Sequence, residues 1–139
     1  MSSVKLNKMI EKLQLVNLVP EVSTDEIEIS SPEINRPALQ LAGYFEHFAS
    51  ERVQIIGYVE YTYLKSLDRD VKLANYEQFL SSDIPCVIYS TRTEPDEDMI
   101  ELAKKYHKPL LSSHRITSDL MAEVIRWLGV ELAPCISIH

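Results

Sequence analysis

The sequence predicts an α/β fold, a single compact domain with a mostly parallel sheet flanked by helices. The 139 residues suit one domain, and a chain of this length buries about two-thirds of its unfolded surface. The composition, 45% hydrophobic and 25% charged, is typical of globular proteins. From Val53 onward, short apolar runs alternate with helical patterns, which indicates βαβ units with right-handed crossovers.

The first third of the chain predicts one helix and two short strands. Apolar residues at helical spacing predict a helix over residues 6–13, with Ser2 or Ser3 as its cap. An apolar run over 15–19, ended by Pro20, and an alternation over 27–29 predict strands, and 31–35 is expected to be a connection.

A second helix is expected from Asn35 to Phe48. Asn35 would be its N-cap and Pro37 would lie in its first turn. Its apolar stripe would consist of Ala38, Leu41, Ala42, Phe45 and Phe48. Arg36 is expected to anchor the adjoining loop to the sheet, a structural role favoured over ligand binding.

The remaining chain predicts three strands and four helices. Strands are expected over 53–56, 86–89 and 109–111, and helices over 58–67 and 70–80. Pro95 is expected to open a helix with an acidic first turn. A last helix, capped by Thr117 or Ser118 and ended by Gly129, is expected to bury Met121, Val124, Ile125 and Leu128. Residues 133–139 show strand-like alternation.

Charge and glycine content exclude several classes of function. Fourteen basic against 21 acidic residues give a net charge of −7, which argues against nucleic acid or an anionic membrane as a partner. The three glycines, Gly43, Gly57 and Gly129, cannot form either common phosphate-cradling loop.

Cysteine and histidine spacing favours neither metal nor redox chemistry. Cys86 and Cys135 form no C-x-x-C pair, so both are expected to be reduced, with Cys86 buried. The histidines lack ligand spacing, so no metal site is predicted. The start resembles no signal peptide and no apolar run could span a membrane, which favours a cytoplasmic protein.

Polar residues following the predicted strands form a candidate anion-binding site. The carboxyl ends of parallel strands are where α/β sheets bind ligands, and hydroxyls, arginines and helix amides suit a phosphate or carboxylate. The candidates are Thr91, Arg92, His114, Arg115, Thr117 and Ser118. The alternative is that the hydroxyls, with that of Thr93, cap helices while the arginines are solvated. No catalytic residue is predicted.

Three tyrosines lie close together in the predicted helix over 58–67. Tyr58, Tyr61 and Tyr63 cannot all be buried on one face, and exposed tyrosines are enriched at protein contacts. Ordinary core and surface positions are the alternative explanation.

Two segments carry a resemblance to a known family. Residues 36–45, Arg-Pro-Ala-Leu-Gln-Leu-Ala-Gly-Tyr-Phe, and residues 51–57, Glu-Arg-Val-Gln-Ile-Ile-Gly, resemble the N-terminal domain of bacterial HPr kinase/phosphorylase. Elements from the first helix to the Thr117-Ser118 segment follow the expected order. The sequence departs from the family pattern at residues 134–139, where the family more often has a basic residue and threonines.

The resemblance implies a non-catalytic module, over residues 1–132, of a larger protein. Residues 133–139 would begin the linker to a C-terminal kinase domain that uses ATP and Mg²⁺. The family phosphorylates a serine of HPr, the phosphocarrier of the sugar phosphotransferase system, reverses this by phosphorolysis and thereby controls carbon catabolite repression. The resemblance further implies a hexamer-like homo-oligomer, no cofactor in this chain, and a fold resembling the substrate-binding domain of muramyl ligases.

Two other functions stay open from the residues alone. A free-standing sensor could bind a nucleotide or other small anion at the strand ends, and an enzyme in its own right is the third possibility. The residues encoded after His139 would distinguish them, because a Gly-Lys-Ser/Thr loop there indicates the kinase.

Overall fold

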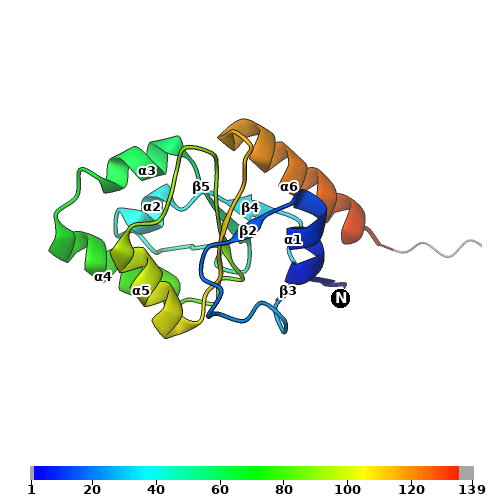
Figure 1. Cartoon of the computed structure of the whole chain (residues 1–139), viewed down its shortest axis with the longest axis horizontal. Coiled ribbons are helices and arrows are strands. Elements are labelled where there is room, and N and C mark those ends of the chain that lie inside the picture. Colours follow the sequence, from blue (N-terminus) through cyan, green and yellow to red (C-terminus); the bar gives the residue numbers. More distant parts are fainter. Residues whose placement is uncertain (1, 135–139) are drawn as a thin grey trace, which may run out of the picture.

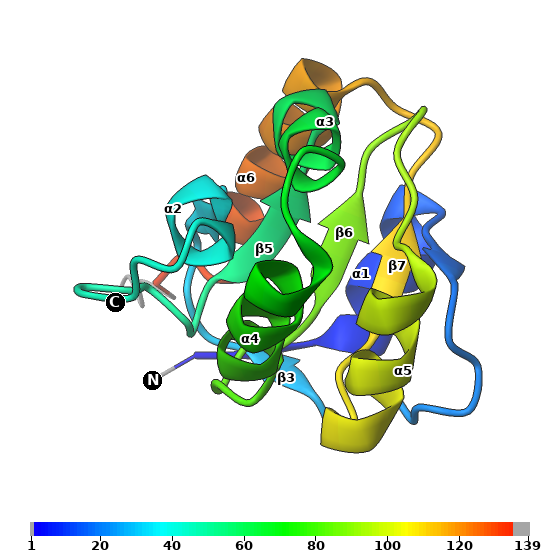
Figure 2. The same cartoon turned by 90° about the vertical axis from the view of Figure 1, so that its left-hand side faces the viewer.

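The computed structural model describes residues 2–134 and contains a five-stranded sheet of order β2-β7-β6-β5-β4. In chain order these strands are β2 (Val16–Asn17), β4 (Ile34–Asn35), β5 (Val53–Ile56), β6 (Val87–Tyr89) and β7 (Leu110–Ser112). Only β2 runs antiparallel to its neighbour. The predicted α/β domain with a mostly parallel sheet is therefore confirmed, and Figure 2 shows β5, β6 and β7 side by side.

Helices cover both faces of the sheet. Those on one face are α2 (Ala38–Leu41), α3 (Tyr58–Leu64), α4 (Arg69–Leu80) and α5 (Glu97–Tyr106), which connect successive parallel strands. Strands β4, β5, β6 and β7 are neighbours in the sheet in their sequence order. Because crossover connections between parallel strands have the same handedness, the helices between these strands lie on the same face. The other face is covered by α1 (Leu6–Leu13) and α6 (Thr117–Glu131), which Figure 1 shows on the side opposite α4 and α5. A two-stranded ribbon of β1 (Val4–Lys5) and β3 (Glu28–Ile29) contributes to the same core.

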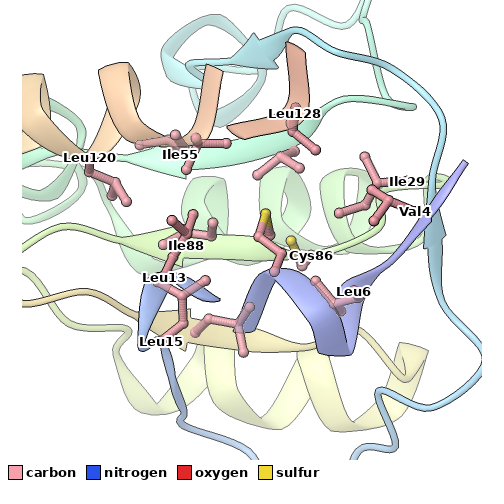
Figure 3. Packing of buried hydrophobic residues seen from close by; sticks show 14 of the residues in the cluster. Val4, Leu6, Leu13, Leu15, Ile29, Ile55, Cys86, Ile88, Leu120 and Leu128 are labelled. Carbon is pink, nitrogen blue, oxygen red and sulfur yellow. The ribbon is translucent and has the colours of Figure 1, made fainter. Parts of the chain in front are cut away.

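Alternate residues of the central strands form two hydrophobic cores. Ile55, Ile88 and Leu111 are in register on three adjacent strands and pack against α1 and α6 (Figure 3). Ile56 and Tyr89, also in register, belong to the core beneath α4 and α5. Because both faces are buried, β5 is a continuous apolar run interrupted only by Gln54, as in other parallel sheets.

The predicted helix over 35–48 is wrong beyond its first turn. Helix α2 has four residues, and Asn35 lies in β4, where its Nδ2 donates to Gln54 Oε1 (2.7 Å) and Gln40 Oε1 (3.1 Å) instead of capping a helix. Gly43 adopts φ 97°, which ends the helical path. Phe48 nevertheless reaches the core, so its apolar spacing reflects burial from a loop.

Several helix boundaries also differ from prediction. Neither Ser2 nor Ser3 caps α1, because Lys5 is its N-cap, and α3 ends three residues early. Helix α5 begins after Asp96, whose Oδ1 accepts from the Met99 amide at 2.8 Å.

Helix α6 begins after Ile116 and continues through Gly129 to Glu131. It buries Leu120 with Val124 and Leu128, whereas Ile125 is 45% exposed, so the predicted stripe is wrong at that residue. Within the predicted tail, residues 135–139 lie outside the described part of the chain.

Candidate functional site

Three loops meet at the carboxyl edge of the sheet. Strands β5, β6 and β7 end in register at Ile56, Tyr89 and Ser112. The loop after β6 is fixed to its neighbours because the Ser90 amide donates to Ile56 O (3.1 Å) and the Thr91 amide to Arg115 O (2.8 Å). The segments predicted to converge at this edge therefore do so.

Three of the six candidate anion-binding residues line one small hollow. Thr91, Arg92 and Thr117 surround a cavity of about 180 Å³ together with Tyr58 and Ile116. Arg92 is exposed, has φ 65°, and forms no ion pair with any acidic residue within 2–134. A guanidinium beside two hydroxyl-bearing side chains suits an oxyanion of phosphate size.

The other three candidates do not line this hollow. Arg115 Nη1 donates to Leu13 O at 2.7 Å, so its guanidinium holds the carboxyl end of α1. His114 and Ser118 are exposed, and neither lines the cavity.

The alternative interpretation, in which the hydroxyls of Thr93 and Thr117 cap helices, is wrong. Ile116 is the N-cap of α6, and the Thr117 hydroxyl lies 2.9 Å from the Ser90 hydroxyl. Thr93 Oγ1 donates to Ser90 O at 2.7 Å and caps no helix, because Asp96 is the N-cap of α5. These hydroxyls instead join the loop after β6 to itself and to α6.

Arg36 has a structural role, as predicted, but it anchors the loop to helix α3 and not to the sheet. Its Nε and Nη2 donate to Glu60 Oε2 (2.6 Å) and Oε1 (2.5 Å), and the Glu60 side chain is 2% exposed. The Gly57 amide also donates to Glu60 Oε1 at 3.1 Å. A Cβ on Gly57 would lie 2.6 Å from the Thr117 methyl carbon and 2.7 Å from Arg36 Nη2, so this close approach requires glycine.

A larger cavity at the same edge was not predicted. We call it the Tyr89 pocket; its volume is about 320 Å³ and it lies between α3, α4 and the loop before α5. Its lining residues are Tyr61, Leu64, Lys65, Lys72, Tyr76, Tyr89, Glu94, Pro95 and Asp96.

Asp96 is the most heavily bonded group of the Tyr89 pocket. Besides capping α5, it accepts from the Tyr76 hydroxyl (2.8 Å) and pairs with Lys72 Nζ (2.9 Å), both at Oδ2. Burial and the neighbouring Asp96 carboxylate raise the pKa of both Tyr76 and Tyr89, so both phenols stay protonated at neutral pH. The Tyr89 hydroxyl, unlike that of Tyr76, donates to no residue among those described.

One sequence signal could have indicated this pocket. Tyr89 is the polar-tipped residue at the carboxyl end of the most apolar predicted strand, where ligand sites of parallel sheets occur. Its partners come from α3, α4 and the next loop, and no spacing in the sequence relates them.

Residues 2–134 contain neither a metal-ligand cluster nor a helix suited to a membrane. No group of three or more His, Cys, Asp or Glu side chains in this range could hold a metal ion. None of its helices combines the length and apolar character needed to cross a membrane.

Comparisons with known proteins give a consistent result along the whole chain. Residues 4–128 match the family model described as "HPr Serine kinase N terminus". The chain is 45% identical over 139 residues to an HPr kinase/phosphorylase of Lachnoclostridium phytofermentans and 39% identical to one of Alkaliphilus metalliredigens. Each match covers 100% of this chain but 45% of the relative, so the chain spans less than half the length of these proteins.

A solved structure shares the fold. The CBS and DRTGG domains of the regulatory region of Clostridium perfringens pyrophosphatase, complexed with its activator diadenosine tetraphosphate, match with a TM-score of 0.56 and 16% identity. The match covers 94% of this chain and 47% of that structure, and it supports the architecture alone.

Proposed function

The chain belongs to the family of HPr serine kinase N-terminal domains, and from that membership we propose that it is the non-catalytic assembly and regulatory domain of a cytoplasmic HPr kinase/phosphorylase. The observation that carries the proposal is the similarity of the entire chain to 45% of the length of each of these enzymes, together with the match to the family model of the N terminus. The parent protein would phosphorylate a serine of HPr, reverse the reaction by phosphorolysis, and so control carbon catabolite repression.

The glycines support a non-catalytic role for this domain. Phosphoryl transfer needs backbone amides and a lysine around the nucleotide phosphates, with Mg²⁺ nearby. Gly43 lies in the turn after α2, Gly57 precedes α3, and Gly129 is inside α6, so no loop gathers them. We therefore assign ATP and Mg²⁺ to the proposed C-terminal kinase domain. That domain is also the partner of this one in the full-length protein.

Exposed apolar side chains support a role in assembly. Tyr58 and Ile116 are 58% and 55% exposed and line the same hollow, and Val59 beside them is 69% exposed. Soluble proteins use such clusters for protein contacts. We assign them to contacts within a homo-oligomer, hexamer-like in the full-length protein, in which HPr binds through the kinase domain.

The decisive experiment compares the full-length protein with a version lacking residues 2–132. We expect the shortened protein to keep transferring labelled phosphate from ATP to HPr, and its assembly state or its response to effectors to change. The isolated chain should transfer none above a blank without protein. Transfer by the isolated chain, or a stop codon directly after His139, contradicts the proposal.

A second candidate function is that of a sensor of a small anion. It is favoured by Arg92, which lies beside Thr91 and Thr117 and forms no ion pair with the residues that the structure describes. A hollow of about 180 Å³ has room for a phosphate group. Phosphate should then raise the melting temperature more than chloride at equal ionic strength, since it binds only the folded state. Arg92→Ala should abolish the rise, while Arg126→Ala, on an exposed face of α6, should preserve it. Equal rises with both salts contradict this function.

A further inference from the structure

We propose that the Tyr89 pocket binds a small ring-bearing organic anion, whose carboxylate or phosphate oxygen accepts a hydrogen bond from the Tyr89 hydroxyl. The Tyr89 pocket shares no lining residue with the hollow that Thr91, Arg92 and Thr117 surround. The inference goes beyond the proposed function, because binding is measured on the chain itself and does not depend on a kinase.

The Tyr89 hydroxyl is the group that requires a ligand. Tyr89 is 1% exposed on the central strand β6, and its hydroxyl forms no hydrogen bond with residues 2–134. Among those residues, Arg52 Nε is the one fully buried side-chain polar atom without a partner, so the Tyr89 hydroxyl must open into the pocket that it lines. Nearly buried polar groups are almost always hydrogen-bonded. A protonated phenol at this position calls for an acceptor oxygen.

The acidic groups of the pocket leave room for an anion. Both Asp96 oxygens are engaged, by the Met99 amide and by the Tyr76 hydroxyl with Lys72 Nζ. The carboxylate is thus compensated by a cation and by the amino end of α5. Glu94 also lines the pocket but is exposed to solvent, which screens its charge.

The lysines determine the sign of the ligand's charge. Lys65 Nζ lies 4.2 Å from the centre of the Tyr61 ring, and Lys72 Nζ lies 5.8 Å from that of Tyr76. The tyrosine faces that would attract a cationic ligand are therefore already occupied by the chain's own cations. Lys65 has no acidic partner within 4 Å among the described residues, and Glu94 acts on it only through space, so an anion can pair with Lys65 without breaking an ion pair.

The walls and volume indicate a ring on the ligand. Leu64 and Pro95 face the pocket together with the tyrosine side chains, which gives it apolar surfaces. A volume of about 320 Å³ is at the lower end of the range of small-molecule sites and exceeds what phosphate alone would fill. The position beyond the carboxyl end of a parallel strand is where such sheets bind ligands.

The test is a titration of the ¹⁵N-labelled chain followed by NMR. The probes are adenosine 5′-monophosphate and orotate, which combine a ring with a phosphate or a carboxylate, compared with adenosine and inorganic phosphate at constant ionic strength. We expect saturable shifts at the amides of Lys65, Tyr89 and Glu94, at concentrations at least tenfold lower for one or both ring-bearing anions. Binding of only one of them identifies the anionic group.

Tyr89→Phe removes the hydroxyl and nothing else. Because that hydroxyl has no hydrogen-bond partner among residues 2–134, the variant should keep the wild-type melting temperature and bind the anion at least tenfold more weakly. Tyr63→Phe is the matched control: it removes a hydroxyl from an exposed tyrosine that does not line the pocket and should leave binding unchanged. The inference is overturned by shifts confined to Thr91 and Arg92, by equal binding of adenosine or phosphate, or by undiminished binding in Tyr89→Phe.

Discussion

Replacing Arg36 by methionine should destabilise the fold far more than loss of an ordinary surface ion pair. Glu60, with 2% of its side chain exposed, would keep only the Gly57 amide as a partner. Removing one member of a buried pair costs about 3–5 kcal/mol, because the remaining charge stays buried. Arg36 itself is 31% exposed, so water can partly replace it, and we expect a loss near the lower end, about 3 kcal/mol. For a domain of this size, this corresponds to a melting temperature lower by roughly 10 °C.

Urea unfolding followed by circular dichroism measures this loss of free energy. The matched control is Arg69→Met, because Arg69 also forms a two-bonded pair, with Asp98, but its side chain is 72% exposed. That variant should lose less than about 1 kcal/mol. Adding Glu60→Gln to Arg36→Met removes the orphaned charge and should restore part of the stability. Equal losses for Arg36→Met and Arg69→Met would refute the argument that burial of Glu60 decides the cost.

Three further measurements test other parts of the structure. Gly57→Ala should lower the free energy of unfolding by about 1–3 kcal/mol through overpacking. Gly129→Ala should raise it by up to about 1 kcal/mol, because Gly129 is in α6 and no atom of residues 2–134 lies near the added methyl group. A change of the same sign in both variants would contradict the packing around Gly57. Burial raises the pKa of the Cys86 thiol to about 12, so mass spectrometry should find Cys86 unmodified by iodoacetamide at pH 8 in the folded chain and modified in urea. The hydrogen bond from Arg69 lowers the pKa of Asp98 in the folded chain below its ordinary 3.8. The stabilisation of the fold by ionised Asp98 is therefore complete above pH 3.8 and is lost as the pH falls through the pKa of Asp98 in the folded chain. In Asp98→Asn, the free energy of unfolding should decrease less steeply with falling pH in this acid range.

The sequence identified most strands and helices because their burial pattern is local. The apolar runs around Ile55 and Ile88 are short and flanked by turns, and the structure places both in central strands. The predicted helix over 35–48 was wrong because Phe45 and Phe48 reach the core from a loop, and hydrophobic spacing does not distinguish these two routes.

The carboxyl edge was predictable, whereas the direction of its side chains was not. Strand order and register bring the loops after β6 and β7 together, which is a consequence of the parallel pattern. Arg115, predicted to face an anion, instead bonds to Leu13 O, 102 residues away in the sequence. A long side chain has several acceptors within reach, and only the packed neighbours decide among them.

By itself, the sequence determined the layered α/β architecture and the family resemblance, because both depend on the order and local pattern of residues. Tertiary structure alone decided the polar partnerships: Arg36 with Glu60, Ser90 with Thr117, and Asp96 with Tyr76 and Lys72. Within the described part of the chain, it also left the Tyr89 hydroxyl without a hydrogen-bond partner beside a cavity. Hydrophobic burial is non-directional and follows periodicity, whereas a hydrogen bond requires two atoms about 3 Å apart in a suitable direction, which only the assembled loops provide.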